Sequence, residues 1–280
     1  MPRVAELLAE GVRLAGDEAR RESEVLLCAA LGKPRSYLFA WPDAQVDEAG
    51  AAQFRSWLED RVRGVPLAYI LGQREFWSLP LTVSDATLVP RPDTELLVER
   101  ALALDLPADV AVLDLGTGSG AIALALASER PGWRLTGVDS SAKALAVAAA
   151  NGQRLALDTL RWLHGSWFES LGVAERFALI VSNPPYLAGD DPHLDAGDLR
   201  FEPREALVSG TDGLDAIRHI IEQAPRHLEP QGWLLLEHGF EQAASVRKQL
   251  SAGGFCGVQS YRDLAGHERV TAGRLPPQTA

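Results

Sequence analysis

The sequence predicts a mainly parallel α/β domain that follows a small helical domain. From about residue 109 onward, short apolar runs alternate with helical segments, which is typical of βαβ units and a parallel sheet. Before residue 75, apolar residues instead recur at helical spacing, and glycine and proline close the segments. A chain of 280 residues is long enough for both domains.

Helices dominate the prediction for residues 1–75. One includes the apolar positions between Leu7 and Leu14, a second ends at Gly32 and Pro34, and a third covers about 47–63. We expect their apolar faces to pack into a small bundle, which can also present a face to a partner.

A change of pattern follows the helices. Residues 67–88 mix aromatic and apolar residues with glycine, serine, proline and aspartate, which predicts a short hairpin. We assign 76–89 to this hairpin linker and 90–280 to the α/β domain. The run Pro-Arg-Pro-Asp-Thr-Glu at 90–95 has the proline and acidic residues of a helix N-terminus, and capping alone would explain it.

Strands and helices alternate in the α/β domain. Strands are expected at 110–115, 135–138, 160–163, 177–182 and 233–236, with late strands at 255–258 and 268–274. Helices are expected at 120–129, 141–152 and near 213–228.

Composition narrows the classes of function. The net charge of −11 argues against non-specific binding to phosphate backbones, and residues 1–75 contribute only −2 of it. Cys28 and Cys256 are too few and too distant for a disulfide framework, and the six histidines lack metal-ligand spacing. We find no signal peptide or long apolar run, so we expect a cytoplasmic protein without a bound metal.

A glycine-rich loop follows the first strand of the α/β domain. The segment Asp-Leu-Gly-Thr-Gly-Ser-Gly at 114–120 has glycines that allow close approach of a ligand to the backbone. Its spacing is GxGxG, and such loops also serve nicotinamide enzymes. The candidate cofactor-binding residues of this loop are Gly116, Thr117, Gly118, Ser119 and Gly120.

Two further residues favour one cofactor. Asp139 ends the second strand, where its carboxylate could accept hydrogen bonds from two ribose hydroxyls or could cap the next helix. Trp167 follows the third strand and could lie against a purine ring or pack against the sheet. The glycine loop, the acidic end of strand two and Asn-Pro-Pro-Tyr at 183–186 together favour S-adenosylmethionine over NAD.

The run Asn183, Pro184, Pro185 and Tyr186 follows a buried strand and cannot continue it, because proline lacks an N–H and has a fixed φ. A stiff corner at the carboxyl end of a strand is expected, either as a plain turn or as a ligand site. The Asn183 side-chain oxygen and the Pro184 carbonyl could accept both hydrogens of one NH₂ group, with Tyr186 stacked on it. The chemistry predicts a planar NH₂ acceptor: a glutamine amide, adenine N6 or cytosine N4.

Together these motifs resemble the bacterial peptide chain release factor glutamine methyltransferases. The resemblance covers essentially the whole chain. It is carried by residues 90–95, 114–120, 165–168, 181–186, 200–207 and 236–239. Asn-Pro-Pro-Tyr is shared with DNA adenine methyltransferases, so the flanking motifs and the domain order distinguish the two.

The resemblance implies a Rossmann-like S-adenosylmethionine-dependent methyltransferase domain. The implied reaction is N5-methylation of the glutamine in the Gly-Gly-Gln motif of class-1 release factors, with residues 1–75 recognising the substrate. The cofactor would be bound by residues 116–120, Asp139, Trp167 and Asn183. The substrate glutamine would be bound by residues 183–186. Ser166 departs from the acid that many relatives have there, which leaves the adenine contact open; His238 has no derived role.

Two alternatives remain at this point. Methylation of amino groups in DNA or RNA would need a basic groove and target-reading domains, for which a chain of charge −11 offers no sign. A non-catalytic binding protein of the same fold would usually have lost the glycine loop or the Asn-Pro-Pro run, and both are intact. We expect class-1 release factors as partners, no direct nucleic-acid or membrane partner, and a monomer.

Overall fold

The computed structural model describes residues 1–14 and 18–277. The chain forms two compact units, Met1–Gln73 and Arg74–Ala280. The expected domains 1–75 and 90–280 include residues 15–17 and 278–280, which lie outside the described part.

The first unit is helical. Its helices are α1 (Val4–Glu10), α2 (Ala19–Leu31), α3 (Arg35–Ala40), α4 (Glu48–Val62) and α5 (Leu67–Leu71). Helix α2 ends at Gly32, whose φ of 59° is left-handed, and α4 begins at Asp47, whose side chain accepts a hydrogen bond from Gly50 N at 2.7 Å. Leu27 and Phe54 are fully buried between α2 and α4.

Helices α3 and α5 are absent from the sequence prediction. Pro34 does end α2, but its extended backbone also makes it the N-cap of α3. The expectation that residues 67–71 belong to a hairpin is wrong. They form α5, which starts after Pro66 and ends at Gly72, where φ is 68°.

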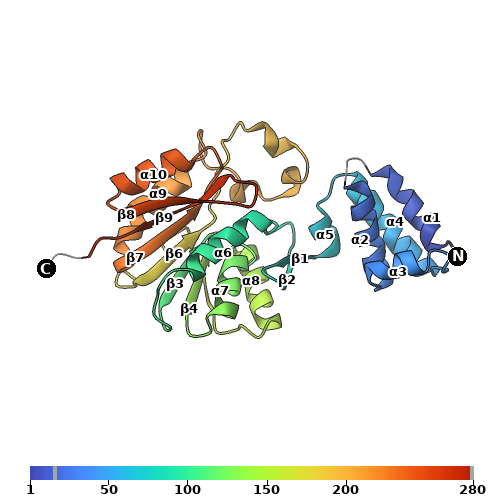
Figure 1. The fold of residues 1–280 in the computed structure, drawn as a ribbon, viewed down its shortest axis with the longest axis horizontal. Coiled ribbons are helices and arrows are strands. Elements are labelled where there is room, and N and C mark those ends of the chain that lie inside the picture. The colour runs from blue at the N-terminus through green and yellow to red at the C-terminus, as the bar shows by residue number, and fades with distance from the viewer. Residues whose placement is uncertain (15–17, 278–280) are drawn as a thin grey trace. The chain divides into compact units, whose positions relative to one another are not determined.

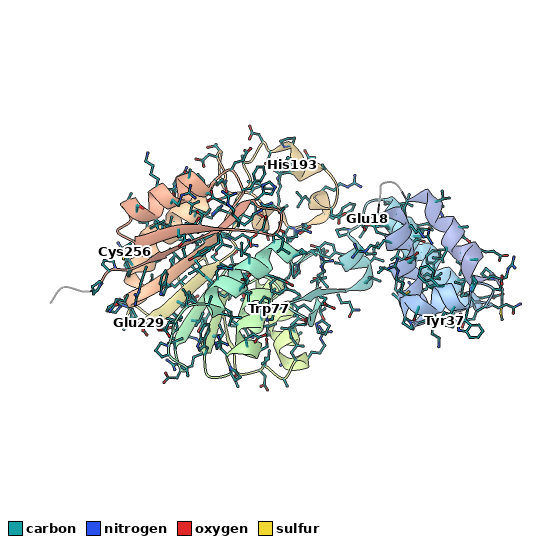
Figure 2. The ribbon with its side chains drawn as sticks, viewed as in Figure 1. Glu18, Tyr37, Trp77, His193, Glu229 and Cys256 are labelled. Carbon is teal, nitrogen blue, oxygen red and sulfur yellow. The ribbon has the colours of Figure 1, made fainter. Side chains whose placement is uncertain are left out.

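The predicted hairpin is present in a shorter segment. Strands β1 (Gln73–Phe76) and β2 (Leu79–Thr82) form a two-stranded sheet, and Trp77 and Ser78 between them both have positive φ, as a type I′ turn requires. Phe76 is buried in the core of the second unit, and Trp77, labelled in Figure 2, donates to Glu129 Oε1 at 2.8 Å. The hairpin therefore packs as part of the α/β unit.

A seven-stranded sheet organises the second unit (Figure 1). The strands are β3 (Ala111–Leu115), β4 (Arg134–Asp139), β5 (Arg161–His164), β6 (Phe177–Ser182), β7 (Leu228–Glu237), β8 (Cys256–Arg262) and β9 (Glu268–Arg274). Their order is β5-β4-β3-β6-β7-β9-β8; only the pairs made by β9 are antiparallel. The chain runs outward from β3 to β5 and returns to β6 on the other side of β3. This reversal creates a switch point between β3 and β6, where ligands bind in such folds.

Helices cover both faces of this sheet (Figure 1). They are α6 (Glu95–Leu102), α7 (Ala121–Glu129), α8 (Ala142–Arg154), α9 (Asp215–Gln223) and α10 (Ala243–Ala252). Because side chains alternate along a strand, Val112 of β3 joins one core cluster, while Leu113 and Leu115 join the cluster on the opposite face. Burial on both faces explains why the strands read as continuous apolar runs.

Several expected boundaries shift in the structure. The helix expected near 213–228 ends at Gln223, because Pro225 cannot continue it, and a 3-10 turn leads into β7. Strand β7 begins at Leu228, earlier than the expected 233, and α10 is not predicted at all. The remaining turns are 3-10 helices η1 (Gly11–Arg13), η2 (Pro92–Thr94), η3 (Pro192–Asp195), η4 (Leu199–Phe201), η5 (Arg204–Ala206) and η6 (Ala224–Arg226). Among residues 1–14 and 18–277, no helix has the length and apolar character needed to span a membrane.

Candidate active site

A cleft lies at the carboxyl ends of β3, β4 and β6, beside the switch point of the sheet. It encloses about 760 Å³, including the part open to solvent. Its lining comprises Ala86, Thr87, Leu88, Gly116, Gly118, Val138, Asp139, Ser140, Ser141, Ala144, Ser166, Trp167, Asn183, Pro185, Pro203, Glu205 and Ala206.

The glycine loop (residues 116–120) joins β3 to α7. Gly116, Gly118 and Gly120 have φ values of 69°, 57° and 82°, which side-chain-bearing residues rarely adopt. At Gly120 a Cβ would also lie 3.1 Å from atoms of Leu124 and Trp162. Gly116 and Gly118 line the cleft, whereas Thr117, Ser119 and Gly120 lie behind it and are buried.

Asp139 supports the glycine loop from the neighbouring strand. Its Oδ2 accepts a hydrogen bond from Gly118 N at 2.8 Å, and its Oδ1 accepts one from Ser141 N at 2.8 Å. Burial raises the pKa of this carboxyl group, and the two backbone bonds oppose that effect. Ser141 is the N-cap of α8, so helix capping by Asp139 is wrong. Each oxygen keeps a further lone pair for a ligand hydroxyl.

A second carboxyl group lies under the loop. Asp114 is fully buried on β3, and its Oδ2 accepts a hydrogen bond from the Thr117 hydroxyl at 2.6 Å. Burial raises the pKa of Asp114 to about 7, and the Thr117 bond reduces the shift.

Asn151 is a functional residue that the sequence patterns do not predict. This fully buried side chain on α8 donates from Nδ2 to the carbonyls of Ser119 and Thr82, both at 3.0 Å, and its Oδ1 accepts from Thr82 N at 2.7 Å. It therefore joins the glycine loop to strand β2 of the hairpin. Its partners are about 30 and 70 residues away, beyond the reach of local sequence patterns.

Trp167 and Ser166 form the wall next to the loop. Trp167 has a φ of 51° and is half-buried, and a Cβ on Gly116 would lie 3.8 Å from its ring. The indole also packs against the core cluster below the sheet, so packing and a ligand-facing surface coexist in one side chain. Ser166 lines the cleft at the position where the resemblance implies an acid in many relatives.

The Asn-Pro-Pro-Tyr corner (residues 183–186) begins directly after β6. Ser182, the last residue of β6, donates to the Leu115 carbonyl at 2.7 Å, which fixes the corner beside the glycine loop. Asn183 Nδ2 donates to Thr94 Oγ1 at 3.1 Å. Within residues 1–14 and 18–277, no hydrogen bond ends at Asn183 Oδ1 or at the Pro184 carbonyl, so both acceptors are available.

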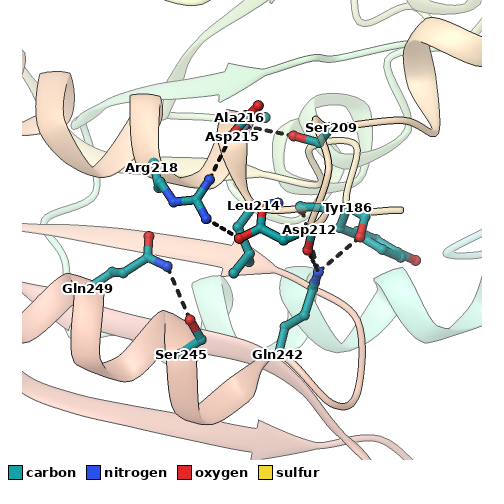
Figure 3. A network of polar contacts seen from close by, with 11 residues as sticks. Tyr186, Ser209, Asp212, Leu214, Asp215, Ala216, Arg218, Gln242, Ser245 and Gln249 are labelled. Carbon is teal, nitrogen blue, oxygen red and sulfur yellow. Dashed lines mark hydrogen bonds and ion pairs between the residues drawn. The ribbon is translucent and has the colours of Figure 1, made fainter. Parts of the chain in front are cut away.

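Tyr186, at the other end of the corner, is held through its backbone (Figure 3). Gln242 Nε2 donates to the Tyr186 carbonyl at 3.0 Å. Gln242 Oε1 accepts from Gly239 N at 2.9 Å. A Cβ on Gly213 would lie 2.2 Å from the same carbonyl, so this close approach requires glycine. Burial, and then the nearby Glu237 carboxylate, raise the pKa of Tyr186, which keeps its phenol neutral.

The Leu-Glu-His-Gly segment at the end of β7 lies behind the corner. Glu237 is buried with Oε2 unpartnered, and burial raises its pKa to about 7. His238 donates from Nδ1 to the Gly239 carbonyl at 2.9 Å and accepts from the Thr271 hydroxyl at 2.7 Å. Burial lowers the pKa of His238, so we assign this neutral ring a structural role between β7 and β9.

Two of the motifs noted in the sequence meet beside the cleft. Arg91 forms an ion pair with the buried Glu202, whose Oε2 also accepts from Val89 N at 3.1 Å. Burial raises the pKa of Glu202, and Arg91 opposes that effect most strongly. The pair connects the residues before α6 to the segment that includes Glu205 on the cleft wall.

Charge distinguishes between the ligands considered for this cleft. Its lining contains the carboxyl groups of Asp139 and Glu205 and no lysine or arginine. Such a wall disfavours the pyrophosphate of a dinucleotide and suits a ligand with a positive charge. Within the described ranges, no group of three or more His, Cys, Asp or Glu residues is arranged to hold a metal ion.

The fold and the site together define a methyltransferase of the doubly wound α/β class. Residues 92–211 match the family model of the methyltransferase small domain, and residues 6–72 match that of the PrmC N-terminal domain. A methyltransferase structure from Pyrococcus furiosus covers 71% of this chain and 89% of its own, with a TM-score of 0.54 and 18% identity, and so supports the fold alone.

Closer relatives identify the family. The release factor glutamine methyltransferase of Pseudomonas aeruginosa is 54% identical over 98% of this chain and 99% of its own. That of Vibrio cholerae is 51% identical over 92% of this chain and 90% of its own. The chain belongs to the release factor glutamine methyltransferase family.

Proposed function

We propose that this protein transfers a methyl group from S-adenosylmethionine to the side-chain amide nitrogen (N5) of the glutamine in the Gly-Gly-Gln motif of class-1 translation release factors. The observation that carries the proposal is the pair of available acceptors, Asn183 Oδ1 and the Pro184 carbonyl, beside a cleft with acidic walls. This chain is 54% identical to a release factor glutamine methyltransferase, and that similarity supports a glutamine substrate for the two acceptors.

The residues of the cleft suit the proposed cofactor. When bound, S-adenosylmethionine supplies an electrophilic methyl group on a positively charged sulfur. Asp139 would accept hydrogen bonds from ribose hydroxyls, Trp167 would cover the adenine, and the glycine loop would follow the ligand closely because it lacks side chains at Gly116 and Gly118. Asn183 lies in the same lining and would contact both cofactor and substrate.

The Asn-Pro-Pro-Tyr corner would orient the glutamine amide. An amide nitrogen is a poor nucleophile because its lone pair is delocalised. Two acceptors, Asn183 Oδ1 and the Pro184 carbonyl, would fix both N–H bonds and stabilise the positive charge that develops on nitrogen. Pro185 stiffens the corner, and Tyr186 would stack on the planar amide. No general base is required, because an alkylated amide nitrogen loses its proton readily.

We assign substrate recognition to the N-terminal helical domain, residues 1–75. Its net charge of −2, against −9 for the rest of the chain, makes it the less repulsive part towards a ribosome-associated partner. In this proposal the protein acts as a monomer in the cytoplasm, where release factors work, and does not bind nucleic acid directly.

The test uses the purified full-length protein with isotopically labelled S-adenosylmethionine and an unmethylated class-1 release factor. Mass spectrometry of release-factor peptides should locate one labelled methyl group on the glutamine of Gly-Gly-Gln. The matched control is a release factor in which that glutamine is replaced by glutamate, which removes the amide. Absence of label from the glutamine peptide, or transfer to plasmid DNA or RNA in its place, would overturn the proposal.

A further inference from the structure

Thr94 is a buried residue next to the Asn-Pro-Pro-Tyr corner that the sequence analysis explained by helix capping. It is the N-cap residue of α6, but its side chain makes no capping hydrogen bond. Its side chain is only 4% exposed, and its hydroxyl instead accepts a hydrogen bond from Asn183 Nδ2 at 3.1 Å, across 89 residues of sequence. The Thr94 hydroxyl therefore forms its hydrogen bond with the corner and not with the backbone of its own helix.

This contact matters because an asparagine amide has two different ends of similar shape. With Oδ1 turned towards the substrate, Asn183 accepts an N–H; with the amide rotated by half a turn, its NH₂ group would oppose the NH₂ of the substrate. The unfavourable orientation brings two donors together and leaves them unpaired, which is costly in a dry site. Activity therefore depends on which end of Asn183 is held away from the substrate.

A hydroxyl group alone does not select one orientation, because it can either donate or accept. Glu237, the buried carboxyl group at the end of β7, also interacts with Thr94: burial raises the pKa of Glu237, and the Thr94 hydroxyl opposes that effect. In its ionised form Glu237 only accepts, so the Thr94 hydroxyl directs its proton to Glu237 and its lone pairs to Asn183. Only the NH₂ end of Asn183 can pair with those lone pairs.

We propose that Thr94 is a positioning residue, which, with Glu237 behind it, holds Asn183 with Oδ1 towards the amino group to be methylated. This inference rests on the proposed function, since it specifies how the same corner receives its substrate. The chain from Glu237 through Thr94 to Asn183 connects β7, the start of α6 and the end of β6, three segments that meet only in the folded unit.

The experiment compares Thr94→Val with Thr94→Ser in the full-length enzyme, using release-factor methylation under saturating cofactor. Valine has nearly the shape of threonine but cannot accept from Asn183, whereas serine retains the hydroxyl. We expect kcat to fall about tenfold or more for Thr94→Val, and to stay within about threefold of wild type for Thr94→Ser. Cofactor affinity, measured by calorimetry, should stay within about twofold for both variants.

Thr136→Val is the matched control, because Thr136 is a similarly buried threonine of β4 outside the cleft lining. It should leave kcat unchanged. A Thr94→Val enzyme with wild-type kcat would overturn the inference, and so would a Thr94→Ser enzyme as impaired as the valine variant. If Thr94→Val does not fold, Thr94→Ala replaces it with the same expectation. Failure of the wild-type protein to methylate the release factor would refute the proposed function instead.

Discussion

The glycine loop after β3 and the Asn-Pro-Pro-Tyr corner after β6 lie at adjacent strand ends but are built from opposite kinds of residue. The loop has glycines at three left-handed positions, so its backbone can approach a ligand without a side chain between them. The corner has two prolines, which remove N–H groups and restrict φ. One segment is shaped for close approach, and the other presents carbonyl and amide oxygens in a fixed direction.

The two segments also differ in what supports them. The glycine loop is held by residues of the strands and helix that surround it, because Asp114 accepts from Thr117, Asp139 accepts from Gly118 N, and Asn151 donates to the Ser119 carbonyl. The corner is held by segments farther away in the sequence, with Thr94 at one end and Gln242 at the other. We therefore expect damage to the loop to weaken cofactor binding, and damage to the supports of the corner, Thr94 and Gln242, to lower turnover with little effect on the cofactor.

Removal of the Asn183 side chain should have the largest effect. In Asn183→Ala one of the two acceptors for the substrate amide is lost, and kcat should fall about 100-fold or more. Thermal unfolding should stay close to wild type, because the side chain is only partly buried. Steady-state assays with the release factor would measure the loss. A variant within about threefold of wild type would refute the two-acceptor mechanism.

Asp139→Ala tests the other segment. Loss of the carboxylate removes its support of Gly118 and the proposed ribose contacts, so the Kd for S-adenosylmethionine should rise about 10- to 100-fold. At saturating cofactor, kcat should change much less. Isothermal titration calorimetry supplies the affinity. Equal losses in cofactor affinity and in kcat would show that the loop and the corner are not separable in this way.

Gln242→Met should release the far end of the corner. The methionine fills a similar volume but cannot donate to the Tyr186 carbonyl, and we expect kcat to fall about tenfold. Gln249→Met is the control, since Gln249, also shown in Figure 3, donates to Ser245 within α10 and does not reach the corner. Similar kcat values for the two variants in the same methylation assay would argue against a positioning role for Gln242.

The smallest expected effect concerns stability and pH. Burial raises the pKa of Asp114 from 3.8 to about 7, so the folded state keeps a proton that the unfolded state has lost. This group therefore makes the protein less stable as pH rises from about 4 to about 8, with no further change above. Between pH 6 and pH 7, the free energy of unfolding of the wild-type protein should fall by about 1 kcal/mol more than that of Asp114→Asn. Denaturant unfolding at pH 6, 7 and 8 measures this difference, and parallel profiles would contradict it.

The sequence predicts the parts of the site that follow directly from strand endings. Buried runs are visible as apolar stretches, and Gly or Pro residues mark where they stop, so β3, β6 and the segments after them are found. Residues that hold the site from elsewhere in the chain are not predicted, because no local pattern around Asn151 or Gln242 indicates which distant residues they contact. Thr94 shows the limit most clearly: its position predicts a helix cap, but a tertiary hydrogen bond replaces the capping bond.

The same limit applies to elements with weak local signals. Helix α10 presents only three buried apolar residues, Ala243, Val246 and Leu250, among polar neighbours, so its pattern is faint until the sheet is assembled. Residues 67–71 are aromatic and apolar enough to suggest a strand, but Pro66 and Gly72 at their two ends favour one short helix. In both segments the end residues and the tertiary packing outweigh local composition.

The available pair of acceptors in the corner also has a consequence for the end of the catalytic cycle. An unmodified glutamine amide offers two N–H bonds, one for Asn183 Oδ1 and one for the Pro184 carbonyl. Once the nitrogen has received a methyl group it has a single N–H, so one acceptor loses its partner. The corner therefore binds the product less tightly than the substrate, which favours dissociation after a single transfer and opposes dimethylation.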